Sequence, residues 1–275
     1  MRLEEFKANQ LLVLPPNPDV DFSGKTIIIT GANAGIGYEL VRYYLKQNAK
    51  HIVMVCRSME KAQKAKEKLL AEANRKDDGV ITIELMNMLS FTSVKACADK
   101  LNATLDSVHV IHHNAGMACV PKQLSEDGYE TVAQTNVLSS SQFALLTHPL
   151  LKKTSEKEGV QTRSVFTCTD GIYYIPDDVS QKHEGVGYVK HLAVDREITK
   201  EQEIWHYCAT KNYLANFARE YAKRISPQNV SVWLAAPGLT QTEFAQKSHD
   251  GVLDEKQKKN EDMYETKPHG NLGKR

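Results

Sequence analysis

Tyr207 and Lys211 are the pair in this 275-residue chain whose types and spacing best suit acid–base chemistry. They lie four residues apart, just before a segment, Asn212 to Arg224, that is predicted to be helical. Side chains at this spacing share one helix face, so the ammonium can stand beside the phenol. The ordinary pKa of tyrosine is about 10, and a nearby cation lowers it toward neutral pH. Such a phenol can act as a general acid.

Both residue types are common on helices, so the interpretation depends on what precedes them. Thr26 to Thr30 are β-branched throughout, which predicts a strand buried on both faces. Three glycines, Gly31, Gly35 and Gly37, follow it, and Glu39 to Leu45 is predicted to be helical. A strand, a glycine turn and a helix direct backbone N–H groups and the positive helix end at one point, as a dinucleotide pyrophosphate requires. The alternative is a turn with a purely structural role.

A second strand, His51 to Cys56, ends where dinucleotide folds place an acidic residue that binds the adenosine ribose. Here that place is taken by Cys56, and Arg57 follows. The missing carboxylate removes repulsion of a 2′-phosphate, and a guanidinium can pair with it. The sequence therefore favours NADP(H) over NAD(H), unless Arg57 is only a solvated loop arginine.

The remaining apolar pattern alternates between strands and helices, which predicts an α/β fold with a doubly wound parallel sheet in a single domain. Further strands are expected over Val80 to Met86, Ser107 to His112, Ser164 to Thr169 and Val230 to Ala235. Further helices are expected over Ser58 to Ala73, Thr92 to Leu101 and Gly128 to Leu151, with Pro149 bending or stopping the last of these. Adjacent strand residues point to opposite faces, so His112 and His113 are interpreted as structural, and no metal site is expected.

Taken in chain order, these features resemble the short-chain dehydrogenase/reductase family. The resemblance rests on Thr30 to Gly37, which reads Thr-Gly-x-x-x-Gly-x-Gly, on His113-Asn114-Ala115-Gly116, on a hydroxyl at the end of the fifth strand, and on Tyr207 with Lys211. It covers roughly Gly24 to Phe244 and is strongest for the branch that contains retinol dehydrogenases and the WW-domain oxidoreductase. It implies a Rossmann-like domain that interconverts a carbonyl and an alcohol with NADP(H).

The resemblance also implies roles for single residues. Thr169, beside Cys168, takes the place of a catalytic serine and would orient the substrate oxygen, while Asn136 would seat a proton-relay water. Asn87 stands near the place of an adenine-binding aspartate and still offers a carbonyl oxygen. The expected cofactor-binding residues are Gly31, Asn33, Gly35, Ile36, Gly37, Arg57, Asn87, Asn114, Ala115, Gly116, Tyr207, Lys211, Pro237, Gly238 and Thr240.

Composition limits the partners. The 35 basic and 34 acidic residues nearly cancel, so no global field favours nucleic acid or an anionic membrane. The five cysteines are widely spaced and lack C-x-x-C pairs, which indicates reduced thiols rather than a zinc site. No stretch reaches the roughly 20 apolar residues of a membrane span. A cytoplasmic protein is the simplest interpretation, with import into an organelle as the alternative.

Three segments are predicted: an arm over residues 1–24, the dinucleotide-binding domain over 25–244, and a polar tail over 245–275. The tail shows no strand pattern, so the last strand usual in the family is expected to be absent, and a homo-oligomer or larger assembly stays open. Ile172 to Ile175 suggests a lid over a lipophilic carbonyl or alcohol substrate. The alternative function is a catalytically weakened fold, kept as a structural or regulatory subunit.

Overall fold

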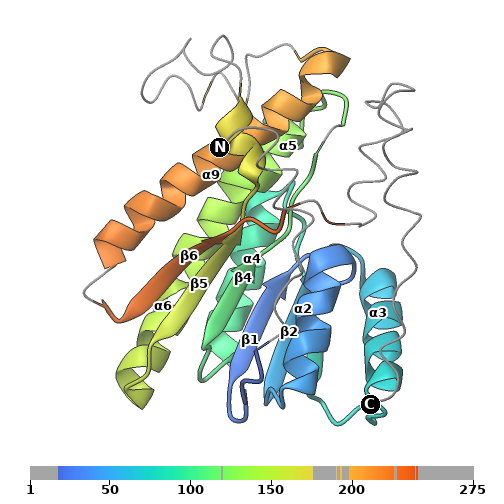
Figure 1. Cartoon of the computed structure of the whole chain (residues 1–275), viewed down its shortest axis with the longest axis vertical. Coiled ribbons are helices and arrows are strands. Elements are labelled where there is room, and N and C mark those ends of the chain that lie inside the picture. The colour runs from blue at the N-terminus through green and yellow to red at the C-terminus, as the bar shows by residue number, and fades with distance from the viewer. Residues whose placement is uncertain are drawn as a thin grey trace.

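The computed structural model describes residues 18–118, 120–175, 190, 193, 198–225, 228–238 and 240. This part of the chain contains one six-stranded sheet in the order β3-β2-β1-β4-β5-β6, with every neighbouring pair parallel (Figure 1). The strands are β1 Thr26–Thr30, β2 His51–Cys56, β3 Ile81–Leu85, β4 Val110–His113, β5 Thr162–Thr167 and β6 Val230–Ala235. The expected doubly wound parallel sheet in one Rossmann-like domain is confirmed.

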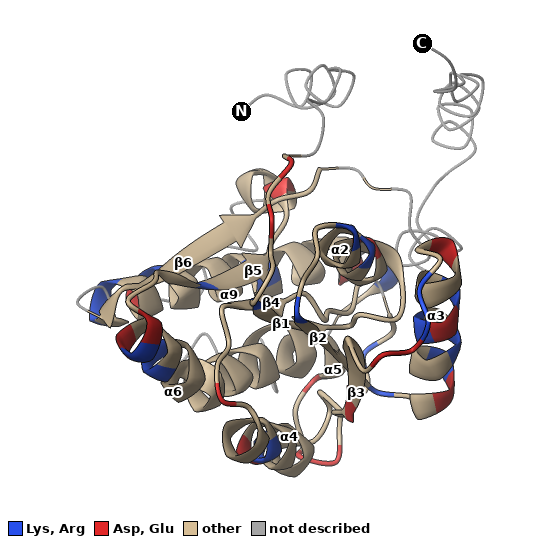
Figure 2. Ribbon diagram, turned by 90° about the horizontal axis from the view of Figure 1, so that it is seen from below, with Lys and Arg blue, Asp and Glu red and all other residues tan. Residues whose placement is uncertain are grey.

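Helices cover both faces of this sheet (Figure 2). The α-helices are α2 Gly35–Lys46, α3 Met59–Glu72, α4 Phe91–Thr104, α5 Thr131–Ala133, α6 Ser140–Glu158 and α9 Glu203–Ile225. A π-helical turn, η1 Gln134–Ser139, joins α5 to α6, and two 3₁₀ turns are η2 Asp170–Tyr174 and η4 Lys200–Gln202. Because successive strand residues face opposite sides, Ile27 and Ile29 pack with α2 and α3, whereas Ile28 packs with α4, α6 and α9.

The strands predicted at β1, β2 and β6 are confirmed to the residue. β1 is buried along its whole length, which explains why its sequence is apolar or β-branched without alternation. The helix predicted over Ser58 to Ala73 is also confirmed, with these two residues as its caps. The side chain of Ser58 accepts a hydrogen bond from the backbone N–H of Lys61, so it satisfies one of the unpaired first-turn donors.

The helix expected over Gly128 to Leu151 differs from the prediction in two ways. It starts at Thr131 as a short α-turn and passes through the π-turn before α6 begins. Pro149 does not stop it, because α6 continues to Glu158 and ends only at Gly159, whose φ is +68°. The side-chain amide of Asn102 in α4 donates to the carbonyl of Leu146, 2.9 Å away, which links α4 to the turn of α6 before the proline.

The fifth strand also ends earlier than expected, at Thr167 rather than Thr169. The backbone N–H of Cys168 still donates to the carbonyl of Ala235 in β6, but Thr169 already caps the 3₁₀ turn that follows. Its hydroxyl accepts from the N–H of Gly171 at 3.1 Å. The strand stops because a local side-chain cap replaces the ladder.

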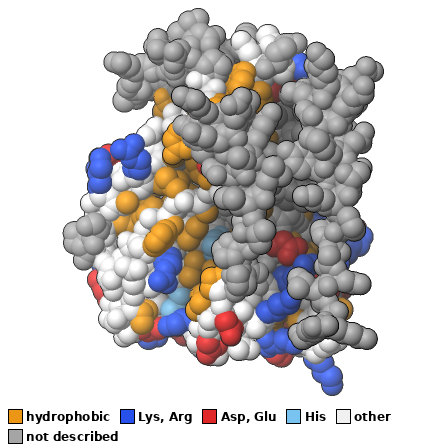
Figure 3. All heavy atoms as spheres, in the orientation of Figure 1, with side chains coloured by type: hydrophobic (Ala, Val, Ile, Leu, Met, Phe, Trp, Pro, Cys, Tyr) orange, Lys and Arg blue, Asp and Glu red, His pale blue; other side chains and the backbone are white. Residues whose placement is uncertain are grey.

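β6 forms one edge of the sheet and is open to solvent at its end. Trp233 is 57% and Leu234 is 42% exposed, and hydrophobic side chains gather along this strand in Figure 3. Among the described residues no helix is long and apolar enough to cross a membrane. Residues 1–17 of the predicted arm, the predicted tail and the question of a further strand lie outside the described residues.

Candidate active site

The glycine turn after β1 brings the start of α2 into direct contact with the sheet edge. Gly31 has φ +66°, and a Cβ there would lie 3.1 Å from the Cα of Ala115. A Cβ on Gly37 would lie only 2.3 Å from the carbonyl oxygen of Gly31, so no larger residue fits this helix start. Ala34 gives α2 no capping side chain, and the first helical N–H groups lack intrahelical partners. The turn can therefore hold a phosphate with its backbone.

Thr30 links this turn to the end of β4. Its Oγ1 accepts the backbone N–H groups of Asn114 and Ala115, both at 2.9 Å. The Asn114 side chain returns a bond from Nδ2 to the carbonyl of Thr30, and its Oδ1 accepts from the hydroxyl of Thr167 in β5. Sequence reasoning placed Thr30 in the motif without a role. The structure shows that Thr30 ties the carboxyl ends of β1 and β4 together, and that Asn114 extends this link to β5.

Lys211 lies at the centre of these strand ends. It is 2% exposed, and its Nζ donates to the carbonyl of Thr167 at 2.7 Å. Burial lowers the pKa of this ammonium to about 8, since desolvation disfavours the charged form. A Cβ on Gly116 would come within 3.5 Å of Nζ and 3.1 Å of Oδ1 of Asn136. The structure therefore brings Lys211, Gly116 and Asn136 together, as expected from the sequence.

Asn136 lies within the π-turn η1, where the regular helical hydrogen bonds are interrupted. Its Oδ1 accepts from the N–H of Met117 and its Nδ2 donates to the carbonyl of the same residue. Nδ2 also donates to Oγ1 of Thr210, which in turn donates to the carbonyl of Tyr207. The asparagine thus joins the loop after β4 to α9. Thr210 was not expected from the sequence, and its place before Lys211 is the signal that could have found it.

Tyr207 and Thr169 are both partly buried, and each stands next to a buried cysteine. Tyr207 lies one helical turn before Lys211 on α9. The Sγ of Cys168 contacts the carbonyl of Lys211, and burial raises the pKa of this thiol. Thr169 is partly buried and carries a hydroxyl, which accepts from the N–H of Gly171, whereas the Cys168 thiol is buried.

The residues expected near the adenosine lie at the ends of β2 and β3. Arg57 is exposed directly after β2, whereas Cys56 is buried against the glycine turn. Burial raises the pKa of the Cys56 thiol to about 11, so no anion stands at this place at neutral pH. The Oδ1 of Asn87 accepts from the N–H of Leu89, which leaves one lone pair for a further donor.

The last expected segment follows β6. Pro237 and Thr240 are described, and Gly238 takes φ +72°, a conformation that favours glycine. The turn begins at the end of β6, beside the carboxyl end of β5. The turn therefore lies at the carboxyl ends of the strands, as Lys211 does.

His112 and His113 point to opposite faces of the sheet, as expected. Nε2 of His112 lies 2.8 Å from the hydroxyl of Tyr44, while Nε2 of His113 lies 3.0 Å from Oγ of Ser164. The ring of His113 stacks on Phe166 at 4.3 Å. Burial lowers the pKa of His112 to about 4 and that of His113 to about 3. Both imidazoles are therefore neutral parts of the core at neutral pH.

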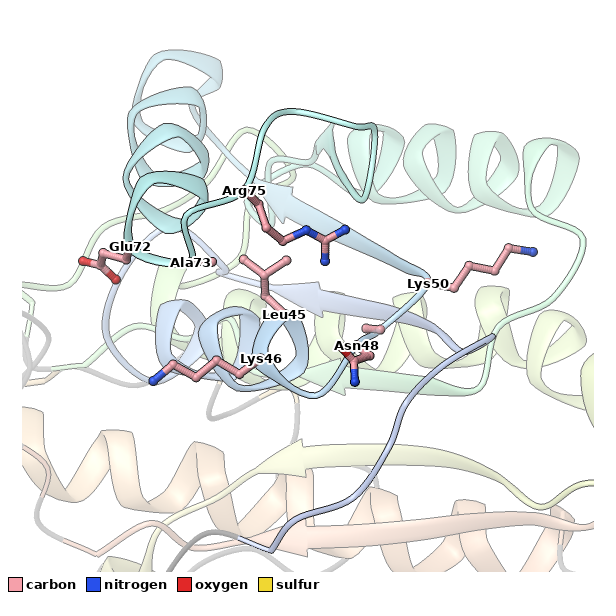
Figure 4. A pocket seen from close by; sticks show the side chains of 8 residues that line it. Leu45, Lys46, Asn48, Lys50, Glu72, Ala73 and Arg75 are labelled. Atoms are coloured by element: carbon pink, nitrogen blue, oxygen red, sulfur yellow. The ribbon is translucent and has the colours of Figure 1, made fainter. Parts of the chain in front are cut away.

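A surface hollow lies far from this chemistry, near the amino end of β2 (Figure 4). Its lining includes Lys46, Lys50 and Arg75, but the side chains of the two lysines point away from one another. Ligands of parallel α/β sheets bind at the opposite, carboxyl ends of the strands. The convergence of polar groups around Lys211 therefore defines the candidate active site.

Comparison with known proteins identifies the family of this chain. The family model described as short chain dehydrogenase matches residues 25–200. The chain therefore belongs to the short-chain dehydrogenase family.

Several curated proteins are similar in sequence. Short chain dehydrogenase sor7 of Hypocrea jecorina (strain QM6a) is 28% identical over 233 residues, which are 83% of this chain and 64% of that protein. Short-chain dehydrogenase/reductase phmF of Phaeosphaeria nodorum (strain SN15 / ATCC MYA-4574 / FGSC 10173) is 30% identical over 234 residues, or 81% of this chain and 64% of that protein. The chain thus spans 64% of the length of each of these relatives. Retinol dehydrogenase 12 of Homo sapiens is 26% identical over 232 residues, 84% of this chain and 66% of the human protein, which confirms the resemblance to that branch.

Solved structures share the fold. The Pseudomonas aeruginosa RhlG/NADP active-site complex has a TM-score of 0.65 and 18% identity, with 90% of this chain and 84% of that chain covered. The 3-ketoacyl-(acyl-carrier-protein) reductase from Brucella melitensis complexed with NADH has a TM-score of 0.60 and 17% identity, with 89% and 91% covered. These two neighbours hold different nicotinamide cofactors, so the fold alone does not decide the preference of this chain.

Proposed function

We propose that this chain is an NADP(H)-dependent oxidoreductase that interconverts a carbonyl and a primary or secondary alcohol on a lipophilic small molecule. The observation that carries the proposal is the fully buried Lys211, fixed on the carbonyl of Thr167 and beside Asn136, with Tyr207 one turn earlier. Burying an ammonium costs free energy because the charge loses its hydration. A buried lysine at the ends of the strands therefore indicates a functional site.

The residues at the strand ends fit a nicotinamide dinucleotide. The turn around Gly31 and Gly37 leaves its backbone open at the positive end of α2, and Gly116 leaves space beside Lys211. When bound, the cofactor supplies or accepts the hydride. Lys211 would hold the nicotinamide ribose, and the turn at Pro237, Gly238 and Thr240 would approach the carboxamide.

The protein's own residues would handle the proton. In reduction, Tyr207 gives its phenolic proton to the substrate oxygen, and in oxidation it takes the proton back. The Lys211 ammonium favours the phenolate form of Tyr207. Thr169 donates a hydrogen bond that orients the substrate oxygen, and the π-turn at Asn136 seats a water that carries the proton onward.

The preference for NADP(H) rests on Arg57 and Cys56. An exposed guanidinium after β2 can pair with a 2′-phosphate in two hydrogen bonds. The neutral, buried thiol before it offers no carboxylate for free ribose hydroxyls. Both features favour NADP(H) over NAD(H).

The lipophilic substrate class rests on the turn η2. Tyr173 in this turn is 68% exposed, and Ile172 is partly buried. The turn packs tightly on α9, since a Cβ on Gly171 would lie 2.7 Å from Sγ of Cys208. Apolar side chains at the mouth of the site favour an apolar substrate body. The structural or regulatory subunit is not favoured, because each polar group that the chemistry needs is retained.

Turnover with and without the phenol tests the proposal. Wild type should oxidise NADPH with some member of a panel of lipophilic aldehydes and ketones. Tyr207→Phe should lose turnover by roughly 10²- to 10⁴-fold, as expected for loss of a general acid, while NADPH affinity changes little. Tyr43→Phe is the matched control, because its hydroxyl bonds to the carbonyl of Pro18, away from the site. Full activity of Tyr207→Phe would contradict the mechanism.

A further inference from the structure

His206 and Glu130 form a buried pair next to the site. Nε2 of His206 lies 2.6 Å from Oε2 of Glu130, and the two side chains are 3% and 2% exposed. The carboxylate also accepts the N–H groups of Val132 and Ala133, at 2.9 and 2.8 Å, as the cap of α5. The carboxylate of Glu130 therefore caps the start of α5 and also bonds to His206, near the start of α9.

Glu130 carries its charge in this position. Burial acts to raise the pKa of its carboxyl, but the hydrogen bond and charge of His206 and the two capping N–H groups lower it below its ordinary value. A buried carboxylate with all its partners in place is fixed in direction, because moving it leaves charge unpaired. The pair is thus a rigid connection between α5 and α9.

A second connection lies one turn further along α9. Thr210 bonds to Asn136 of the π-turn, 3.0 Å away, and to the carbonyl of Tyr207. Residues 206 and 210 are four apart and share one face of the helix, whereas residues 207 and 211 share the adjacent face. Two ties on one face fix the rotation of α9 about its axis, and this rotation decides where the adjacent face points.

We propose that the His206–Glu130 pair is a positioning device for the proton donor: it locks the first turns of α9 so that the Tyr207 phenol meets the substrate oxygen. The inference rests on the proposed function of Tyr207. His206 itself has no contact with substrate or cofactor in this role. It acts through the orientation of its neighbour, and a misplacement of about 1 Å can cost on the order of 10²-fold in rate.

The expected signature is a loss in kcat without a loss in cofactor binding. His206→Leu removes the hydrogen bond and should lower kcat at least about tenfold, because the phenol loses its fixed direction. The dissociation constant for NADPH should stay within about twofold, because the glycine turn is untouched. His206→Gln should restore most of kcat, since its Nε2 can reach Glu130 as the imidazole Nε2 does.

Hydrogen exchange gives a readout that does not depend on turnover. Backbone amides of residues 207–210 should exchange faster in His206→Leu than in wild type, and His206→Gln should reverse this. The matched control is His109→Leu, which breaks another His–Glu contact, 2.8 Å long, between Nε2 of His109 and Glu158. His109 precedes β4, at the opposite end of the sheet, so this variant should lose stability but keep kcat.

Each result decides between the two proposals. If wild type turns over and Tyr207→Phe does not, but His206→Leu keeps full kcat, the positioning role is wrong and the proposed function stands. If His206→Leu exchanges faster yet keeps kcat, the pair is only structural and the inference is overturned. If wild type shows no turnover on any carbonyl, the proposed function fails, and the positioning role fails with it whatever the exchange rates are.

Discussion

The glycine turn after β1 and the Lys211 centre both lie at the carboxyl ends of the strands, but they are made of different groups. The turn uses contiguous residues, Thr30 to Gly37, and works with backbone groups and empty space. The Lys211 centre joins residues far apart in sequence through two side-chain hydrogen bonds, from Lys211 to the carbonyl of Thr167 and from Asn136 to Thr210. Adding an atom should therefore impair the glycine turn, whereas removing a polar group should impair the Lys211 centre.

The two regions also differ in how they meet the energetic demand of ligand binding. Backbone N–H groups at the helix start are already part of the fold, so they need no buried charge. Lys211 must be kept charged inside the protein, and burial already lowers its pKa to about 8. Its hydrogen bond to Thr167 offsets part of that desolvation.

The largest effect on cofactor affinity is expected from adding one methyl group to the turn. Gly37→Ala places a Cβ within 2.3 Å of the Gly31 carbonyl, which is backbone and cannot rotate away. NADPH affinity measured by calorimetry should fall on the order of 10²-fold, because the phosphate-binding turn is displaced. Gly79→Ala is the control for added backbone strain without a clash, since Gly79 has φ +82° and its Cβ meets nothing within 4 Å. Equal affinities in the two variants would show that space at Gly37 is not what the turn requires.

The next effect concerns the hydroxyl beside the Lys211 centre. Thr169→Ala should lower kcat about 10- to 100-fold, through loss of one hydrogen bond to the reacting oxygen, whereas Thr169→Ser should retain or raise it. Cys168→Ala is the control, because this thiol is buried against the carbonyl of Lys211. Steady-state kinetics that show a silent Thr169→Ala and an inactive Cys168→Ala would shift the catalytic position by one residue.

A smaller effect is expected at the adenosine end of the turn. Wild type should bind NADPH at least about tenfold more tightly than NADH, and Arg57→Ala should remove most of this difference by loss of a charge-assisted pair. Lys61→Ala, on the neighbouring helix α3, serves as the charge control. Calorimetry with both cofactors checks the prediction, and equal affinities in wild type would contradict the NADP(H) assignment.

The smallest effect concerns stability under acid conditions. The pKa of His113 is about 3 in the fold and about 6.5 when unfolded, so between these values the unfolded chain binds more protons. Stability should therefore fall as the pH drops below about 6.5, by roughly 1 kcal/mol per pH unit from this residue. His113→Asn should flatten this slope in urea unfolding measured between pH 7 and 5.5. An unchanged slope would mean that His113 is not the group that titrates.

Local chemistry explains what the sequence predicted well. β1 and β2 were placed to the residue because buried parallel strands are apolar or β-branched almost without interruption. β6 was also placed to the residue, although half of it is exposed, because its valines and Trp233 favour strand structure. The glycine turn and the pair Tyr207 and Lys211 are local patterns as well, and the resemblance to the family followed from their order along the chain. Because these patterns are local, the family could be assigned without the three-dimensional structure.

Predictions that depended on distant partners were less accurate. The expectation that Pro149 could stop the helix was wrong, because α6 continues to Glu158, and the end of β5 was misplaced because Thr169 caps a turn. These errors concern boundaries, which local propensity determines only weakly.

The sequence by itself determined the order of elements, the glycine turn after β1 and the family of the chain. Only the tertiary structure decided that Thr30 and Asn114 join three strand ends, that Lys211 is fully buried on Thr167, and that His206 bonds to Glu130. The physical reason is distance along the chain. A strand or a turn is specified by interactions within a few residues, whereas a buried charge needs partners that only the packing of several elements can bring within hydrogen-bonding reach.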